Sequence, residues 1–255
     1  MTSRLAPWPR MVTAGLAALV LLAVLPALLR AMPEFGAHPL PYGDAVNALL
    51  PAARGVMNMV SAVNFDLRAL DTLGEETMLL AAVSGATVLL RGERGERETR
   101  PAALPGRPVP PRSEAVELLC RVLFPVLLVF GLSIVLHAQL TPGGGFQGGV
   151  IIATALLLLW LGAGYRAWRR LLPSHALHAV EGAGLALYVL TGCAGLLAGR
   201  PFLTNLLPNG SWGSLLSGGM IPVLNLGVAL AVAGGFAMLL LEFLEETRAS
   251  RPGEE

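Results

Sequence analysis

The segment HAQLTPGGGFQGG, residues 137–149, joins two strongly apolar runs of the chain. Five of its last seven residues are glycine, the residue that loses the most backbone freedom on folding. Glycines at this density between two apolar runs indicate either exposed backbone or very close helix packing. Both interpretations predict a packed membrane protein with several spanning helices.

The composition of the whole chain supports a membrane protein. Of 255 residues, 54% are hydrophobic and 14% are charged, whereas a soluble domain is typically about a quarter charged. A membrane-spanning helix needs roughly 17–25 residues. Six apolar runs reach or approach this length: 11–29, 73–90, 122–139, 148–164, 178–198 and 219–241. We therefore predict an all-α polytopic protein with about six transmembrane helices, the first retained rather than cleaved as a signal peptide.

The distribution of arginine predicts the orientation. All 18 basic residues are Arg, and they crowd 91–112 and 166–170 and flank both termini. The segment between the third and fourth runs has no basic residue, and that between the fifth and sixth has only Arg200. Under the positive-inside rule both termini are cytoplasmic, although Arg30, Arg54 and Arg68 in the first outer segment oppose this orientation.

A charged and proline-rich stretch divides the chain. Residues 91–117 contain a mixed charge run followed by five prolines, a composition typical of a solvated linker. We expect a two-helix segment at 1–90, a four-helix domain at 118–247 and a polar tail at 248–255. Residues 44–64, apolar but interrupted by polar side chains, predict an interfacial or re-entrant helix. A polar seventh span, which would invert the N-terminus, is the alternative.

Acidic residues stand where the second run begins. Arg68, Asp71 and Glu75 are spaced to share one face of a helix. One interpretation is a proton or cation relay, because carboxylates within a membrane are costly and usually functional. The other is a capping box, in which Thr72 and Glu75 satisfy free amides at the start of the helix.

The glycine-rich segment also has two interpretations. Its irregular backbone lines an ion path, or it is a tight turn whose Gly148 and Gly149 allow helices to approach closely. His137, before the turn, is a candidate for proton exchange.

Other polar residues occur in the fifth and sixth runs. His175, His178 and Glu181 have spacing that resembles metal ligands, but the sequence offers no evident fourth ligand. Glu181, inside the fifth run, is the better candidate for ion handling. Asn225, three residues after Pro222, is expected to satisfy backbone groups near the proline.

Two segments resemble a known family. Residues 141–149, TPGGGFQGG, and 217–225, SGGMIPVLN, resemble the MnhB (MrpB) subunit of Mrp-type Na+/H+ antiporters, and the likeness covers about 118–245. The matching motif residues are Pro142, Gly143, Gly144, Gly145, Phe146, Gly148, Gly149, Pro222 and Asn225. Residues 63–75, VNFDLRALDTLGE, resemble the C-terminal end of the large MrpA subunit and the small E-type subunit of membrane-bound hydrogenases. The chain thus looks like a fusion of the two pieces.

The resemblance implies one membrane subunit of a multisubunit cation/proton antiporter, or of a related hydrogenase or respiratory complex, in the plasma membrane. It implies Na+ and H+ as transported ions, other membrane subunits and the lipid bilayer as partners, and no cofactor, bound metal or redox chemistry of its own. The net charge of +1 gives no case for nucleic acid binding.

The candidates for ion translocation are Arg68, Asp71, Glu75, His137 and Glu181. The resemblance favours the relay interpretation of Asp71 and Glu75 over the capping box, although both can hold at once. The chain departs from the family at Ala231, where lysine is frequent. A purely structural membrane adaptor is the alternative function. A metal-dependent membrane enzyme using His175 and His178 is a third.

Overall fold

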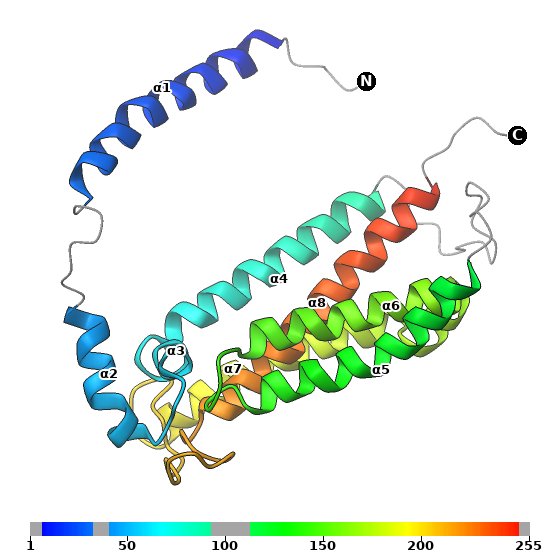
Figure 1. Ribbon diagram of the computed structural model, residues 1–255. Helices are drawn as coiled ribbons and strands as arrows, with labels where there is room; N and C mark the ends of the chain where they lie inside the picture. The colour runs from blue at the N-terminus through cyan, green and yellow to red at the C-terminus, as the bar shows by residue number, and fades with distance from the viewer. Residues whose placement is uncertain (1–6, 33–40, 93–112, 250–255) are drawn as a thin grey trace, which may run out of the picture. The chain divides into compact units, whose positions relative to one another are not determined.

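The computed structural model describes residues 7–32, 41–92 and 113–249, whose regular structure is entirely helical (Figure 1). The elements are α1 (Pro7–Ala31), α2 (Pro41–Arg54), α3 (Met59–Ala62), the π-helical turn η1 (Val63–Leu67), α4 (Ala69–Gly92), α5 (Glu114–Leu136), α6 (Gly145–Leu171), α7 (Ser174–Leu197) and α8 (Ile221–Ala249). The chain forms two compact units, Met1–Gly43 and Asp44–Glu255. Helix α1 belongs to the first unit, and the helices from α4 onward belong to the second.

Six helices of the described residues are long and apolar enough to cross a membrane. They are Met11–Ala31, Ala69–Leu90, Glu114–Leu136, Gly145–Gly164, Ser174–Leu197 and Ile221–Leu244. The prediction of an all-α protein with six spanning helices is confirmed. Most of the expected linker at 91–117 and of the polar tail at 248–255 lies outside the described residues.

The segment between the first two spans forms short elements. Helix α2 has 14 residues, α3 has four and η1 has five, and each is too short to cross a bilayer. The side chain of Asn58 caps α3 by accepting hydrogen bonds from the amides of Val60 and Ser61 at 3.1 and 3.5 Å. The alternative of a seventh span at 44–64 is therefore wrong.

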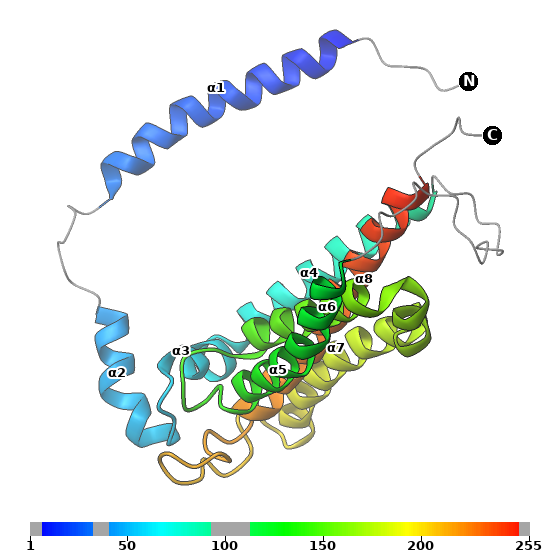
Figure 2. The same ribbon diagram turned by 45° about the vertical axis from the view of Figure 1, so that its right-hand side comes forward.

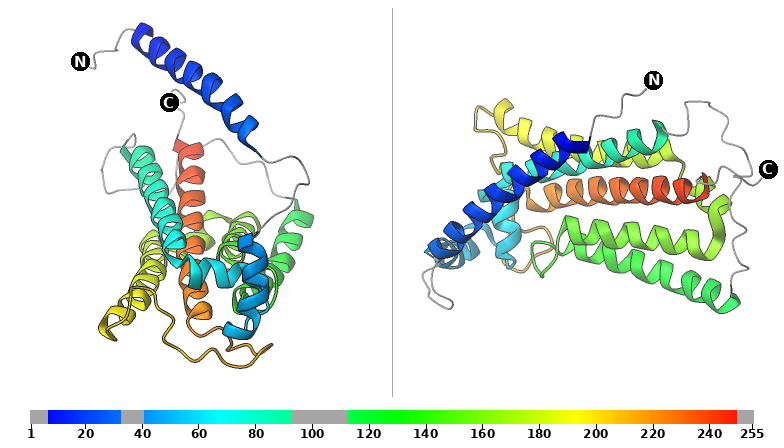
Figure 3. Two further views of the ribbon diagram at one scale, coloured as in Figure 1. Left: turned by 90° about the vertical axis from the view of Figure 1, so that its left-hand side faces the viewer. Right: turned by 90° about the horizontal axis from the view of Figure 1, so that it is seen from above.

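Helix α8 is the central helix of the second unit. In its membrane-length segment, 67% of the residues of the apolar window are buried. The corresponding share is 17 to 33% in α4, α5, α6 and α7. It lies between α4 and α7 on one side and α5 and α6 on the other (Figure 3). Glycines let α7 approach it, since a Cβ atom on Gly184 would overlap backbone atoms of Ala231 and Gly227. The two helices thus touch through their backbones, the contact that small residues permit in membranes.

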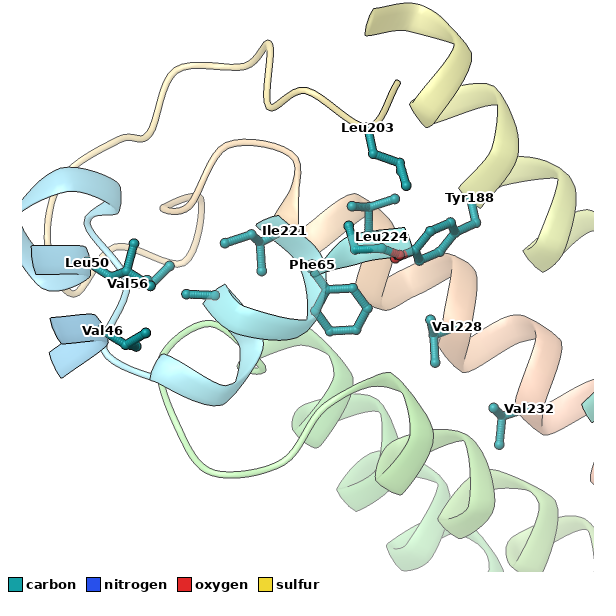
Figure 4. Packing of buried hydrophobic residues seen from close by; sticks show 12 residues of the cluster. Val46, Leu50, Val56, Phe65, Tyr188, Leu203, Ile221, Leu224, Val228 and Val232 are labelled. Carbon is teal, nitrogen blue, oxygen red and sulfur yellow. The ribbon is translucent and has the colours of Figure 1, made fainter. Parts of the chain in front are cut away.

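The helix bundle has two different ends (Figure 2). At the end that we call the capped end lie α2, α3, η1, the turn 137–144 and the loop 198–220. An apolar cluster fills it (Figure 4), comprising Val46, Leu50, Val56, Ala62, Phe65, Ala69, Tyr188, Leu203, Ile221, Leu224, Val228 and Val232. At the opposite end, α4 and α8 finish, α5 begins and α6 connects to α7. The arginines of residues 166–170, in the last turns of α6, belong to this opposite end.

Candidate functional site

The glycine-rich segment forms a tight turn against α8. Helix α6 begins at Gly145, whose amide donates a 2.9 Å hydrogen bond to Oδ1 of Asn225 on α8. A Cβ atom on Gly145 would lie 2.5 Å from the carbonyl oxygen of Asn225 and 2.7 Å from Cβ of Val228. One on Gly149 would lie 2.8 Å from Cβ of Val232. Position 145 must therefore be glycine for α6 to start so close to α8.

The other motif residues complete this contact. Gly148 faces α5, because a Cβ atom there would lie 2.8 Å from the carbonyl oxygen of Gly131. Phe146 packs against the apolar cluster, and Pro142 is exposed. A Cβ atom on Gly144 would lie 3.1 Å from Oδ1 of Asn225, and Gly143 has φ of 131°. Pro222 is the second residue of α8, a place where its missing amide costs little.

Carbonyl groups of the turn are bonded to the segment before η1. Nδ2 of Asn58 donates to the carbonyl oxygens of Ala138 at 2.8 Å and Thr141 at 2.9 Å. Oγ of Ser61 donates to Ala138 O at 2.6 Å, and the amides of residues 57 and 58 donate to Gln139 O at 3.0 and 3.1 Å. The tight-turn interpretation of the segment agrees with this geometry.

Arg68, Asp71 and Glu75 lie on the surface of the chain near the capped end. Arg68 and Asp71 form an ion pair whose side chains are 63% and 52% exposed, and Glu75 is exposed. The capping-box interpretation is wrong. Helix α4 begins at Ala69, and Oγ1 of Thr72 donates a 2.8 Å hydrogen bond to Asn64 O instead.

The buried carboxylate of α4 is Glu76, which was not among the residues predicted from the sequence. Glu76 is 2% exposed, and neither of its carboxylate oxygens has a hydrogen-bond partner among the described residues. The charges of Glu75 and Glu181 act on it. The signal was available, because Thr72, Glu76, Val83 and Thr87 are spaced to share one face of a helix, and all four are buried.

Glu181 of α7 lies in the same interior. It is 3% exposed, and its Oε1 atom has no hydrogen-bond partner among the described residues. A Cβ atom built on Gly235 of α8 would lie 2.9 Å from that oxygen and 3.3 Å from Cγ2 of Val83 on α4. The carboxylate is therefore held where α4, α7 and α8 meet. Oε2 lies 3.7 Å from Nδ1 of His178.

Three buried glutamates are spaced along the axis of the bundle. Glu76 precedes Val83 by two helical turns, about 10 Å at 1.5 Å per residue, and so lies between Glu181 and the capped end. Glu242, which is 0% exposed, follows Gly235 by the same spacing on α8. Glu76, Glu181 and Glu242 thus succeed one another from the capped end toward the opposite end.

The remaining candidates lie apart from this interior. His137 is partly exposed at the end of α5, with Nδ1 placed 2.8 Å from Ser133 O. Ala231 is 4% exposed, and its Cα would lie 3.0 Å from a Cβ atom on Gly184. Within the described parts of the chain, no three His, Cys, Asp or Glu side chains gather closely enough to hold a metal ion. Of the five predicted translocation residues, Glu181 is the one placed with the buried carboxylates.

Comparisons with known proteins agree with this architecture. The family described as "Domain related to MnhB subunit of Na+/H+ antiporter" matches residues 115–238. The B-type subunit of the Na(+)/H(+) antiporter of Bacillus subtilis (strain 168) is 41% identical over 80 residues, which are 31% of this chain and 55% of that protein. The chain thus aligns with about half the length of this relative.

Two solved structures share the fold over nearly the whole chain. A chain of the membrane-bound sulfane sulfur reductase, an archaeal respiratory membrane complex, is 31% identical with a TM-score of 0.71, covering 92% of this chain and 98% of its own. A chain of the Mrp complex from Dietzia sp. DQ12-45-1b is 26% identical with a TM-score of 0.70, covering 99% of this chain and 27% of its own. This chain is a multi-pass membrane protein that belongs to the MnhB family.

Proposed function

We propose that the chain is a membrane subunit of a multisubunit cation/proton antiporter or a related respiratory complex, in which Glu76 and Glu181 carry protons. One observation carries the proposal: two carboxylates, each at most 3% exposed, lie inside a bundle of membrane-length helices. Ionisable side chains within membrane helices are costly and mark ion pathways or proton relays. Membership of the MnhB family supports Na+ as the exchanged cation.

The exposed acidic residues act at the boundary of this protein. Glu75 precedes Glu76 but lies on the exposed face of α4, so it passes ions between Glu76 and a neighbouring membrane subunit. Asp71 is held by Arg68 near the capped end and sets the local charge there. His137, bonded within α5, closes the turn and takes no part in this path.

The organisation of the chain follows from the same proposal. Residues 1–90 correspond to the MrpA C-terminal piece and 118–247 to the MnhB domain, with the linker and both termini on the cytoplasmic side of the plasma membrane. The arginine distribution supports this orientation. The partners are the other membrane subunits of the complex and the surrounding lipid.

The second candidate function is a structural adaptor that carries no ion. It is favoured by the turn 137–144, whose carbonyl groups are engaged by Asn58 and Ser61. Such a rigid end suits a surface that holds larger subunits together. Flux measurements on variants of the buried carboxylates separate the two functions.

The test uses the complete complex reconstituted in sealed vesicles. Glu181→Gln and Glu76→Gln keep the size of the side chain and remove its exchangeable acidic proton. We expect each to lower cation-dependent proton flux at least about a hundredfold, the low end of what a proton-transfer group contributes. Glu117→Gln is the control, since Glu117 forms a surface pair with Arg121 at 3.2 Å on α5. Full flux in both buried variants, with normal assembly, would favour the adaptor.

A further inference from the structure

We infer that His178 delivers protons from the aqueous side at the α6–α7 connection to the carboxylate of Glu181. The inference rests on the proposed function, because it supplies the access step for a carboxylate assigned there to proton transfer. It gives a role to a histidine whose spacing in the sequence resembles that of a metal ligand.

The geometry places His178 between the surface of the chain and the buried carboxylate. The two residues are three positions apart on α7, with Nδ1 of His178 3.7 Å from Oε2 of Glu181. The histidine side chain is 42% exposed, whereas that of Glu181 is 4% exposed. Helix α7 starts at Ser174, so His178 and Glu181 lie about 6 and 10 Å along it at 1.5 Å per residue. One ring therefore joins the surface of the chain to its interior.

The proton-transfer step balances without any other reactant. The protonated ring of His178 gives its Nδ1 proton to Oε2 of Glu181, which leaves a neutral imidazole and a neutral carboxylic acid. Water at the α6–α7 connection then reprotonates the ring. A transfer needs heavy atoms at about 2.6–3.2 Å or one bridging water. At the present 3.7 Å separation, the transfer proceeds through one bridging water or after a closer approach of the ring.

The capped end is packed with apolar side chains. The rings of Phe65 and Tyr188 pack with centroids 6.4 Å apart, within the apolar cluster of this end. The Tyr188 hydroxyl donates a 2.8 Å hydrogen bond to Ala69 O, and Thr72 is bonded to Asn64 O. A proton that enters at the opposite end of the bundle therefore meets His178 before it reaches Glu181.

The other ionisable groups on the helices around the pair come from α4, α6, α7 and α8. Helix α4 contributes Glu76, whose charge interacts with that of Glu181. Helix α8 carries Glu242 on the Gly235 face, and Arg170 is exposed near the end of α6. His175, one turn before His178, is also exposed, and it provides a matched control on the same helix.

The test compares histidine variants in the complete complex in sealed vesicles, with free imidazole as the probe. We expect His178→Ala to lower proton flux at least about a hundredfold, as loss of a proton-transfer group does. Millimolar imidazole should restore the flux, because the removed ring leaves an opening at the surface. His178→Gln, which keeps most of the volume, should lower flux without a response to imidazole. His175→Ala should behave as the unmodified complex.

Full flux in either His178 variant would overturn the inference. So would a loss of flux in His178→Ala that imidazole does not restore in an assembled complex, because a merely structural contact gives that result. These outcomes differ from failure of the proposed function. If Glu181→Gln abolishes flux and His178→Ala does not, Glu181 still carries protons and the access route is another one.

Discussion

The carboxylate of Glu181 occupies space that exists because residue 235 has no side chain: a Cβ atom on Gly235 would lie 2.9 Å from Oε1 of Glu181. The neighbouring Gly234 has the same effect on the backbone, where a Cβ atom would lie 2.6 Å from the amide nitrogen of Glu181. The glycine pair on α8 is therefore a positioning element for the acid on α7.

Substitution of Gly235 by alanine should displace the Glu181 carboxylate without removing it. We expect Gly235→Ala to lower proton flux about tenfold or more, since a misplacement of about 1 Å costs up to about 100-fold in rate. Proton flux in reconstituted vesicles is the measurement. Gly182→Ala is the matched control, because a Cβ atom at Gly182 meets nothing within 4 Å. If Gly235→Ala and Gly182→Ala both keep the flux of the unmodified complex, the exact position of the Glu181 carboxylate does not control proton flux.

Removal of the Asn225 side chain should destabilise the start of α6. Asn225→Ala leaves the buried amide of Gly145 without its acceptor, and a buried unsatisfied donor costs about 1–3 kcal/mol. The free energy of unfolding in detergent should fall by that amount. Leu226→Ala, at an exposed neighbour, should change it by less. An unchanged stability for Asn225→Ala would mean that water replaces the Asn225 side chain as the acceptor for the Gly145 amide.

Asn58→Asp tests how the turn 137–144 is held. Aspartate keeps the acceptor that caps α3 but cannot donate to the carbonyl groups of Ala138 and Thr141. We expect faster hydrogen exchange at the amides of residues 57 and 58, which donate to Gln139 O. Asn209→Asp removes an exposed side-chain bond to Ala53 O and should leave those amides protected. Unchanged exchange in Asn58→Asp would argue that packing alone holds the turn.

Tyr188→Phe separates stability from transport. The hydroxyl is buried and donates to Ala69 O at 2.8 Å, so its loss should lower the free energy of unfolding by about 0.5–1.5 kcal/mol. Proton flux should remain, because the ring still packs on Phe65 and closes the capped end. A variant that folds but loses flux would place the hydroxyl in the proton path.

The spanning helices were predictable because length and apolar composition decide them. The residues that face the interior are not decided by apolar periodicity. In water a polar face marks the outside of a helix, but lipid is as apolar as a protein core, so a membrane helix is oriented by its polar residues, such as Thr72, Glu76 and Thr87 on α4. Glu75 and Glu76 illustrate this limit: sequence spacing favoured the first, whereas the structure buries the second.

The start of α4 was misjudged for a different reason. The apolar run begins at Leu73, which suggested Thr72 as a capping residue. In the structure the π-helical turn η1 precedes α4, and the helix begins at Ala69. A bond from Thr72 to a carbonyl group eight residues earlier depends on that turn. Local spacing does not reveal this geometry.

The contacts of Asn58 with the turn 137–144, and of Tyr188 with Ala69, join parts of the chain more than 75 positions apart. They do not depend on the covalent connection between α4 and α5. A break in that connection would leave a non-covalent heterodimer with the same interior. The two parts can therefore pack in the same way as two separate polypeptides or as one chain. The covalent connection could be gained or lost without a change in the fold.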